Sequence, residues 1–282
     1  MTATIASHLD SSIESQRQVL DALQAQLGAL LETIEEMKTK SGPMLIARYQ
    51  SSLGRLELQL LELQVGVQAA RRRVELLQKR MNHGEAILPA DIVAIDQQIK
   101  VELAQWNDNL VAQAKALDAA NQFLALAVPV SDADMRRAKT AYRRLARLLH
   151  PDANPDNALL FEKYWSAIQS AYARVDVALM EALLEVVEHA TVQSEVAAPD
   201  QSQIDRLRTL VYTHAETVAR MSNEPPHSYA RFLDDEAWVT KRQASLEGAI
   251  AAESSRLASL VIRQSELLAT STFASNATKE SP

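Results

Sequence analysis

The chain has 282 residues, contains no cysteine and carries a formal net charge of −7. Without cysteine it has no disulfide, zinc–cysteine centre or thiol nucleophile, and its acidic balance argues against general nucleic-acid binding. Leu, Ala, Glu, Gln and Arg dominate and only six glycines occur, so we expect an all-α protein with room for two or three domains. The sequence shows no signal peptide and no apolar run approaching the ~20 residues that span a bilayer, so we expect a cytoplasmic protein without membrane contact.

The first ninety residues contain two runs of apolar residues spaced alternately by three and four, separated by KTKSGPM. Such a repeat keeps one helix face against a partner helix, and Gly-Pro usually breaks a helix. Residues 1–90 therefore predict an antiparallel coiled-coil hairpin, with a parallel oligomer as the alternative that buries the same faces. The runs are Ala6, Leu9, Ile13, Leu20, Leu23, Leu27, Leu30, Ile34 and Met37, then Tyr49, Leu53, Leu56, Leu60, Leu63, Val67, Ala70, Val74, Leu77 and Met81.

Residues 91–130 predict a connecting helix that ends near Pro129. After a central segment, residues 190–202 have the composition of a linker. Heptad spacing returns over residues 203–270, interrupted by SNEPPHSY, and predicts C-terminal coiled-coil helices. The Ser/Thr-rich residues 271–282 predict a disordered tail.

The central segment, residues 131–189, begins with a strongly amphipathic helix capped by Ser131 or Asp132. Its apolar stripe consists of Ala138, Tyr142, Leu145 and Leu149, and its opposite face is basic. The basic residues are Arg136, Arg137, Lys139, Arg143, Arg144 and Arg147.

This helix is stopped by the tripeptide His150-Pro151-Asp152, since proline donates no amide hydrogen and clashes with the preceding turn. A second helix follows with Phe161, Trp165, Ile168, Tyr172 and Val175 on one stripe. The two stripes predict a helical hairpin with the tripeptide exposed at its tip. Beyond Tyr172, either a turn at Val175-Asp176 begins another helix or the second helix runs on.

The stretch AYRRLARLLHPDANPD, with WSAIQSAY beyond it, resembles helix II, the loop and helix III of J-domain (DnaJ-like) co-chaperones. Tyr142, eight residues before His150, and the pair Leu145-Ala146 stand at family positions, and Trp165 replaces the usual phenylalanine. The resemblance covers roughly residues 123 to 189. In place of the DYY…LGV signature of helix I, QFLALAVPV keeps only apolar spacing. We therefore expect helix I to be the end of the connecting helix, joined rigidly to the module.

The resemblance implies that the chain binds a DnaK-type chaperone and stimulates its ATP hydrolysis. By position, Arg136, Lys139, Arg143, Arg144 and Arg147 would dock on an acidic surface of that chaperone, and His150, Pro151 and Asp152 would insert near its interdomain linker. Asp152 would there meet an arginine. Gly/Phe-rich and zinc-binding regions are missing, which resembles a subgroup of the family with coiled-coil flanks. The coiled coils would then select a client or an oligomeric state.

Two other interpretations remain open. The chain could be a structural coiled-coil scaffold with a degenerate J-like module, or a nucleic-acid binder that uses the basic helix, which the net charge disfavours. We expect no enzyme, metal or cofactor. The sequence has no Gly-rich nucleotide loop and no HExxH or other paired ligand spacing.

Overall fold

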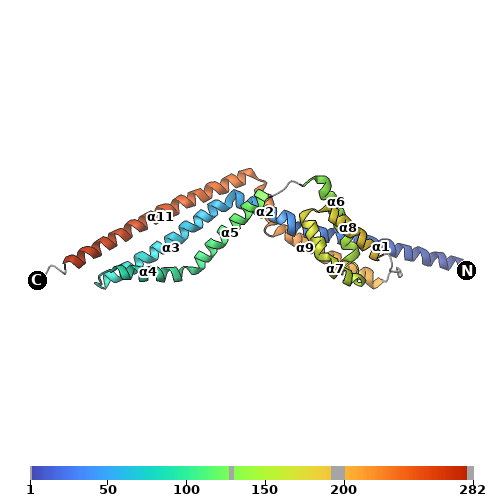
Figure 1. Ribbon diagram of the computed structural model, residues 1–282, viewed down its shortest axis with the longest axis horizontal. Helices are drawn as coiled ribbons and strands as arrows, with labels where there is room; N and C mark the ends of the chain where they lie inside the picture. The colour runs from blue at the N-terminus through green and yellow to red at the C-terminus, as the bar shows by residue number, and fades with distance from the viewer. Residues whose placement is uncertain (1, 127–129, 192–200, 278–282) are drawn as a thin grey trace. The chain divides into compact units, whose positions relative to one another are not determined.

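The computed structural model describes residues 2–126, 130–191 and 201–277, with side chains described over 14–126, 130–191 and 201–270. Every regular element in these residues is helical, which confirms the all-α prediction. The α-helices are α1 (Thr2–Glu36), α2 (Gly42–Tyr49), α3 (Arg55–Asn82), α4 (Pro89–Glu102), α5 (Ala104–Leu126), α6 (Asp132–Leu149), α7 (Ala158–Arg174), α8 (Val177–Thr191), α9 (Gln201–Asn223), α10 (Ala230–Leu233) and α11 (Glu236–Ala277) (Figure 1).

The chain forms two compact units. The first unit contains residues 1–45 and 127–230, and the second contains residues 46–126 and 231–282. Each unit is therefore built from two segments, separated in the sequence by 81 residues in the first unit and by 104 residues in the second.

The predicted hairpin in residues 1–90 is wrong, because the KTKSGPM segment does not break the helix. Two π-helical segments, Met37–Ser41 and Gln50–Gly54, join α1 to α2 and α2 to α3. In the first, the Gly42 amide donates to the Met37 carbonyl five residues earlier. A π-helical turn accommodates a disturbed hydrogen-bond ladder, here one that Pro43 interrupts by having no amide hydrogen.

In the second unit, α3 packs against α11. Gln243 Nε2 donates to the Ser52 carbonyl and Gln264 Nε2 donates to the Ala70 carbonyl, both at 3.0 Å, so the two helices run parallel. This parallel pair differs from the antiparallel pairing of long helices that the sequence predicts within residues 1–90. Helix α4 runs antiparallel to α3, as the Arg72–Glu102 and Arg80–Asp91 ion pairs show, and α5 also packs on α3.

Both heptad faces are nevertheless covered. Every member of the second run, Tyr49 to Met81, is buried or half-buried, as are the members of the first run from Leu20 to Met37. Ala6, Leu9 and Ile13 have side chains outside the described residues. Helix α9 covers α1 and α11 covers α3, so these faces find their partners within one chain and do not require the parallel oligomer.

In the first unit, α6, α7 and α8 pack with α1 and α9 around a common core. Tyr142 lies against Tyr172 (ring centroids 4.5 Å apart), and His150 lies against Phe161 (5.4 Å), so α6 and α7 are antiparallel. Val175, in the left-handed conformation with φ of 56°, ends α7 and separates it from α8. The helix therefore does not run on. The fully buried side chains of this core include Leu27, Leu145, Leu149, Ile168, Met180, Val187 and Leu207.

The expectation that the end of the connecting helix would serve as helix I is wrong. Helix α5 ends at Leu126 in the second unit, where it packs on α3, whereas α6 and α7 belong to the first unit. Pro129 lies outside the described residues. Of the predicted linker, residues 190–191 end α8, residues 201–202 begin α9, and residues 192–200 lie outside the described residues. Of the predicted disordered tail, residues 271–277 are helical and 278–282 lie outside the described residues.

We predict opposite effects of one substitution at two helical glycines. A Cβ at Gly28 would lie 2.9 Å from the Arg143 carbonyl oxygen, so Gly28→Ala forces α1 away from α6. We expect it to lower the free energy of unfolding by about 1–3 kcal/mol. At Gly248 of α11 a Cβ meets nothing within 4 Å, and Gly248→Ala should raise stability by about 0.5–1 kcal/mol. Urea unfolding followed by circular dichroism measures both, and equal effects would contradict the α1–α6 contact.

Candidate functional site

Helix α6 begins as its sequence predicts. The Ser131 hydroxyl accepts a hydrogen bond from the Asp134 amide at 3.0 Å, so Ser131 and not Asp132 is the N-cap. Ala138, Tyr142, Leu145 and Leu149 are all buried. The predicted apolar stripe is therefore the face that holds α6 in the core, and the basic residues are left on the outer side.

The turn after α6 is held by polar side chains that satisfy its last carbonyl groups. Asn157 Nδ2 donates to the Leu148 carbonyl at 2.8 Å, and the Ala153 and Asn154 amides donate to the His150 carbonyl. These bonds replace the helical hydrogen bonds that end at Pro151. They fix the loop formed by His150, Pro151 and Asp152, which we call the HPD loop.

The predicted exposure of the HPD loop is only partly right. The His150 side chain is 18% exposed and that of Asp152 is 34% exposed. The His150 ring meets both Phe161 and Trp165 of α7 edge-on, with centroids 5.4 Å apart in each case. The aromatic stripe of α7 thus continues past the core and fixes the imidazole.

The environment of His150 favours the neutral ring. Burial lowers the pKa of His150, with the Asp152 carboxylate acting in the opposite sense and His214 in the same sense. The Asp152 amide donates to His150 Nδ1 at 3.3 Å, a bond that requires a lone pair on that nitrogen. The imidazole is therefore a fixed, neutral group at the end of α6.

Helix α9 contributes residues to the loop that sequence reasoning missed. His214 Nε2 lies 2.9 Å from Asp152 Oδ2, and Arg206 Nη2 donates to the Asp152 carbonyl at 3.4 Å. From α1, Gln24 Nε2 donates to the Ala153 carbonyl at 3.3 Å. His214 occupies a heptad position, so the sequence assigns it only to a helix face, and nothing in the pattern links it to a loop 62 residues away.

The basic face of α6 is paired with acidic residues on both neighbouring helices. On the α1 side, Arg143 Nη2 lies 2.9 Å from Glu32 Oε2 and Lys139 Nζ lies 2.6 Å from Glu36 Oε2. Arg147 Nη2 lies 2.5 Å from Asp21 Oδ1.

On the α8 side, Arg137 pairs with Glu181 at 2.8 Å and Arg144 with Glu188 at 2.5 Å. Arg136 is exposed and has no ion pair with the residues that the structure describes. The structure thus brings the predicted basic residues together on one face, but five of the six cations there have an acidic partner within the chain.

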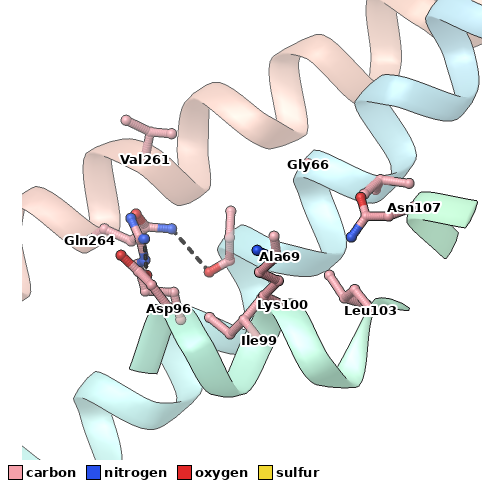
Figure 2. A pocket seen from close by; sticks show the side chains of 12 residues that line it. Gly66, Ala69, Asp96, Ile99, Lys100, Leu103, Asn107, Val261 and Gln264 are labelled. Carbon is pink, nitrogen blue, oxygen red and sulfur yellow. Dashed lines mark hydrogen bonds and ion pairs between the residues drawn. The ribbon is translucent and has the colours of Figure 1, made fainter. Parts of the chain in front are cut away.

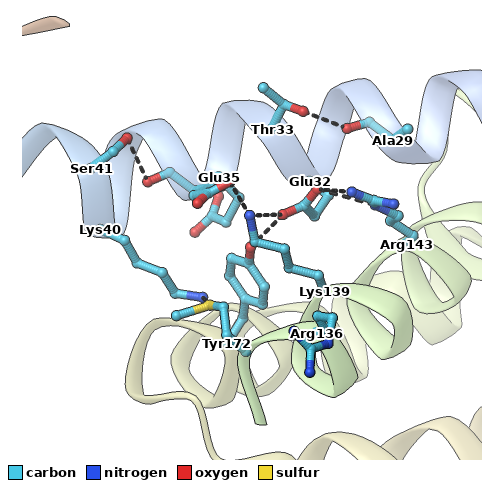
Figure 3. A network of polar contacts seen from close by, with 12 residues as sticks. Ala29, Glu32, Thr33, Glu35, Lys40, Ser41, Arg136, Lys139, Arg143 and Tyr172 are labelled. Carbon is cyan, nitrogen blue, oxygen red and sulfur yellow. Dashed lines mark hydrogen bonds and ion pairs between the residues drawn. The ribbon is translucent and has the colours of Figure 1, made fainter. Parts of the chain in front are cut away.

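The innermost of these pairs belongs to a buried network around Glu32 (Figure 3). The Glu32 side chain is 1% exposed and accepts hydrogen bonds from Arg143 and from the Tyr172 hydroxyl, the latter at 2.6 Å. Burial and the Glu32 carboxylate both raise the pKa of Tyr172, so the phenol keeps its proton and donates. One carboxylate of α1 therefore ties together α6 and α7.

Lys40 closes the other end of this network. Its Nζ lies 3.3 Å from the centroid of the Tyr172 ring and 3.5 Å from Met135 Sδ. Burial lowers the pKa of Lys40 to about 8, despite the opposing effect of Glu36 and Glu32. The folded protein thus disfavours the charged form of this amine relative to the unfolded chain.

We predict a pH dependence of stability that depends on Lys40. Its pKa falls from 10.5 in the unfolded chain to about 8 in the folded one, so between these values the unfolded chain binds more protons. The free energy of unfolding should therefore rise as the pH increases from 8 to 9.5, by an amount on the order of 1 kcal/mol or less after allowance for solvent screening. Lys40→Met should remove that rise. Urea unfolding of both proteins at several pH values gives the difference, and parallel curves would contradict the assignment.

A groove of about 490 Å³ lies in the second unit between α3, α4 and α11 (Figure 2). Its walls include Val65, Ile99, Leu103 and Val261, and Arg73 and Asp96 form an ion pair at its edge. Over the described residues, no group of three His, Asp or Glu could hold a metal ion. The groove therefore offers an apolar surface rather than a set of reactive groups, and the HPD loop is the stronger candidate site.

None of the helices in the described part of the chain is long and apolar enough to cross a membrane. Comparison with known proteins found no match among family models, curated proteins or solved structures.

Proposed function

We propose that the first unit is a J-like module that binds a DnaK-type chaperone and stimulates its ATP hydrolysis. The observation that carries the proposal is the HPD loop itself. It stops α6, leads into the antiparallel α7, and presents the Asp152 carboxylate beside a histidine fixed by two aromatic rings. The bound nucleotide and its hydrolysis would belong to the chaperone, so this chain would be a co-chaperone and not an enzyme.

The proposed contact with the chaperone would consist of Asp152 and a few cations of α6. Asp152 is 34% exposed, enough to reach an arginine of the chaperone. Arg143 and Arg144 are 50% and 63% exposed although both are paired. Exposed ion pairs contribute only about 0–1 kcal/mol, so an acidic group of a partner can replace Glu188 beside Arg144 at small cost, whereas Arg143 stays paired with the buried Glu32. Within the described part of the chain Arg136 has no ion pair to exchange, and it would be the first cation available.

A second candidate is a structural scaffold whose J-like module no longer activates a chaperone. The in-chain pairing of the basic face favours it, because Asp21, Glu32, Glu36, Glu181 and Glu188 offset most of the positive charge that would attract an acidic surface. In both candidate functions, the second unit with its long α3–α11 pair would select a client or partner.

The experiment that separates the two candidates is single-turnover ATP hydrolysis by a DnaK-type chaperone. We expect the parent chain to accelerate hydrolysis and His150→Gln to abolish the acceleration while leaving the circular dichroism spectrum unchanged. His189→Gln is the matched control, since His189 is exposed at the end of α8. Stimulation by His150→Gln equal to that of the parent would rule out the proposed mechanism, whereas no stimulation by the parent would leave the scaffold.

A further prediction concerns Arg136. Arg136→Glu should weaken binding to the chaperone several-fold at low salt and much less at high salt, because the Debye length shrinks from about 10 Å at 0.1 M to about 3 Å at 1 M. Lys241→Glu, an equal charge change on an exposed position of α11, serves as the control. Titration by fluorescence anisotropy at two salt concentrations measures both. An identical salt dependence for Arg136→Glu and the control would contradict docking by α6.

A further inference from the structure

Two residues of helix α9, His214 and Arg206, contact Asp152. A cationic partner that binds Asp152 must compete with both. The His214 ring takes Oδ2 at 2.9 Å, and the Arg206 guanidinium reaches the carbonyl of the same residue at 3.4 Å. His150 Nδ1 is 3.8 Å from the same Oδ2, so it does not replace the His214 contact. In the proposed function the Asp152 carboxylate binds an arginine of the chaperone. In the free protein this carboxylate already binds His214 of the same chain.

The geometry sets up a direct competition. An arginine binds a carboxylate best through two parallel hydrogen bonds, one to each oxygen. With Oδ2 facing His214, only a weaker contact to the other oxygen remains. The fixed positive charge of Arg206 close by adds repulsion toward a second guanidinium. Both effects reduce the affinity of the loop for a cation without changing the loop's shape.

Releasing Asp152 needs only a side-chain movement. His214 is 20% exposed and Asp152 is 34% exposed, so both groups have contact with solvent from which to rearrange. Helix α9 itself stays docked, because Leu207 and Val211 are buried in the core that includes Leu27 and Leu31 of α1. The contact can thus open while the core of the first unit remains intact.

We infer that α9 is a gate on the HPD loop, in which His214 and Arg206 compete with the chaperone's arginine for Asp152. The inference rests on the proposed function, since it concerns how strongly the same loop binds its partner. It assigns His214 a role that restrains binding, in contrast to a residue that positions Asp152 for binding.

The test is the concentration dependence of ATPase stimulation by His214→Leu, which removes the donor and keeps an apolar side chain of similar length. We expect the half-saturating concentration to fall about tenfold, the value for one hydrogen bond to a charged group, while the maximal rate stays unchanged. His214→Gln keeps an N–H donor and should remain close to the parent. Arg206→Gln, an exposed position, should give a smaller fall of about two- to threefold.

Arg208→Gln is the matched control. It lies on the same helix and pairs with Asp205 at 3.1 Å, away from the loop, and should behave as the parent does. An unchanged or raised half-saturating concentration for both His214→Leu and Arg206→Gln overturns the gate while the proposed function stands. If neither the parent nor His214→Leu accelerates a chaperone that responds to another J-protein, the proposed function falls, and the gate falls with it.

Discussion

The first unit depends on a carboxylate that has almost no contact with water. Glu32 on α1 accepts hydrogen bonds from Arg143 on α6 and Tyr172 on α7, and its side chain is 1% exposed. A buried charge is tolerated only where its partners are fixed, and removal of one partner typically costs about 3–5 kcal/mol. The network therefore specifies which helix α6 and α7 accept as a neighbour. Leucine contacts alone, such as those of Leu27 and Leu31, would leave the rotation and register of α1 less strictly defined.

Ion pairs within the chain reduce the positive charge that the basic face of α6 presents to a partner. As a sequence it is a row of six cations, but in the fold α1 and α8 supply acidic partners along both edges. The field that a distant partner would sense is therefore much weaker than the row suggests. Specific recognition would rest on short-range contacts at Arg136 and at the HPD loop, with less help from long-range attraction.

Features set by neighbours in sequence were predictable. The cap at Ser131, the stripe through Tyr142 and Leu145 and the stop at Pro151 each follow from local hydrogen bonding and periodicity, and the structure has them. The pairing of long helices was not predictable, because a heptad repeat states that a face is covered and not which helix covers it. Pro43 led to a wrong prediction for a different reason. Proline usually ends a helix, but here a π-helical turn accommodates the missing hydrogen bond and the helix continues.

The residues of the candidate site also divide into those that were predictable from the sequence and those that were not. His150, Pro151 and Asp152 were visible as a motif, whereas His214 and Arg206 reach the loop from a helix more than fifty residues later. Three acidic partners of the basic face lie 103 to 126 residues earlier on α1, and the other two, Glu181 and Glu188, lie later on α8. Glu32 and Glu35 are next to the apolar positions Leu31 and Ile34 in the sequence. A carboxylate beside a heptad face was the one sign in the sequence that α1 could supply acidic partners. A single sequence gives no means of connecting that sign to Arg143.

The pairing of α1 with α9 and of α3 with α11 also affects the chain during its synthesis. At about 5–20 residues per second, a ribosome needs roughly ten to thirty seconds to pass from the end of α1 to the start of α9. During that interval the apolar face of α1 has emerged without its final cover, and the apolar face of α3 waits about as long for α11. Partly synthesised chains thus have long helices with uncovered apolar faces, which favour aggregation and chaperone binding. A protein proposed to recruit a chaperone for others would, on this account, have an early need of one itself.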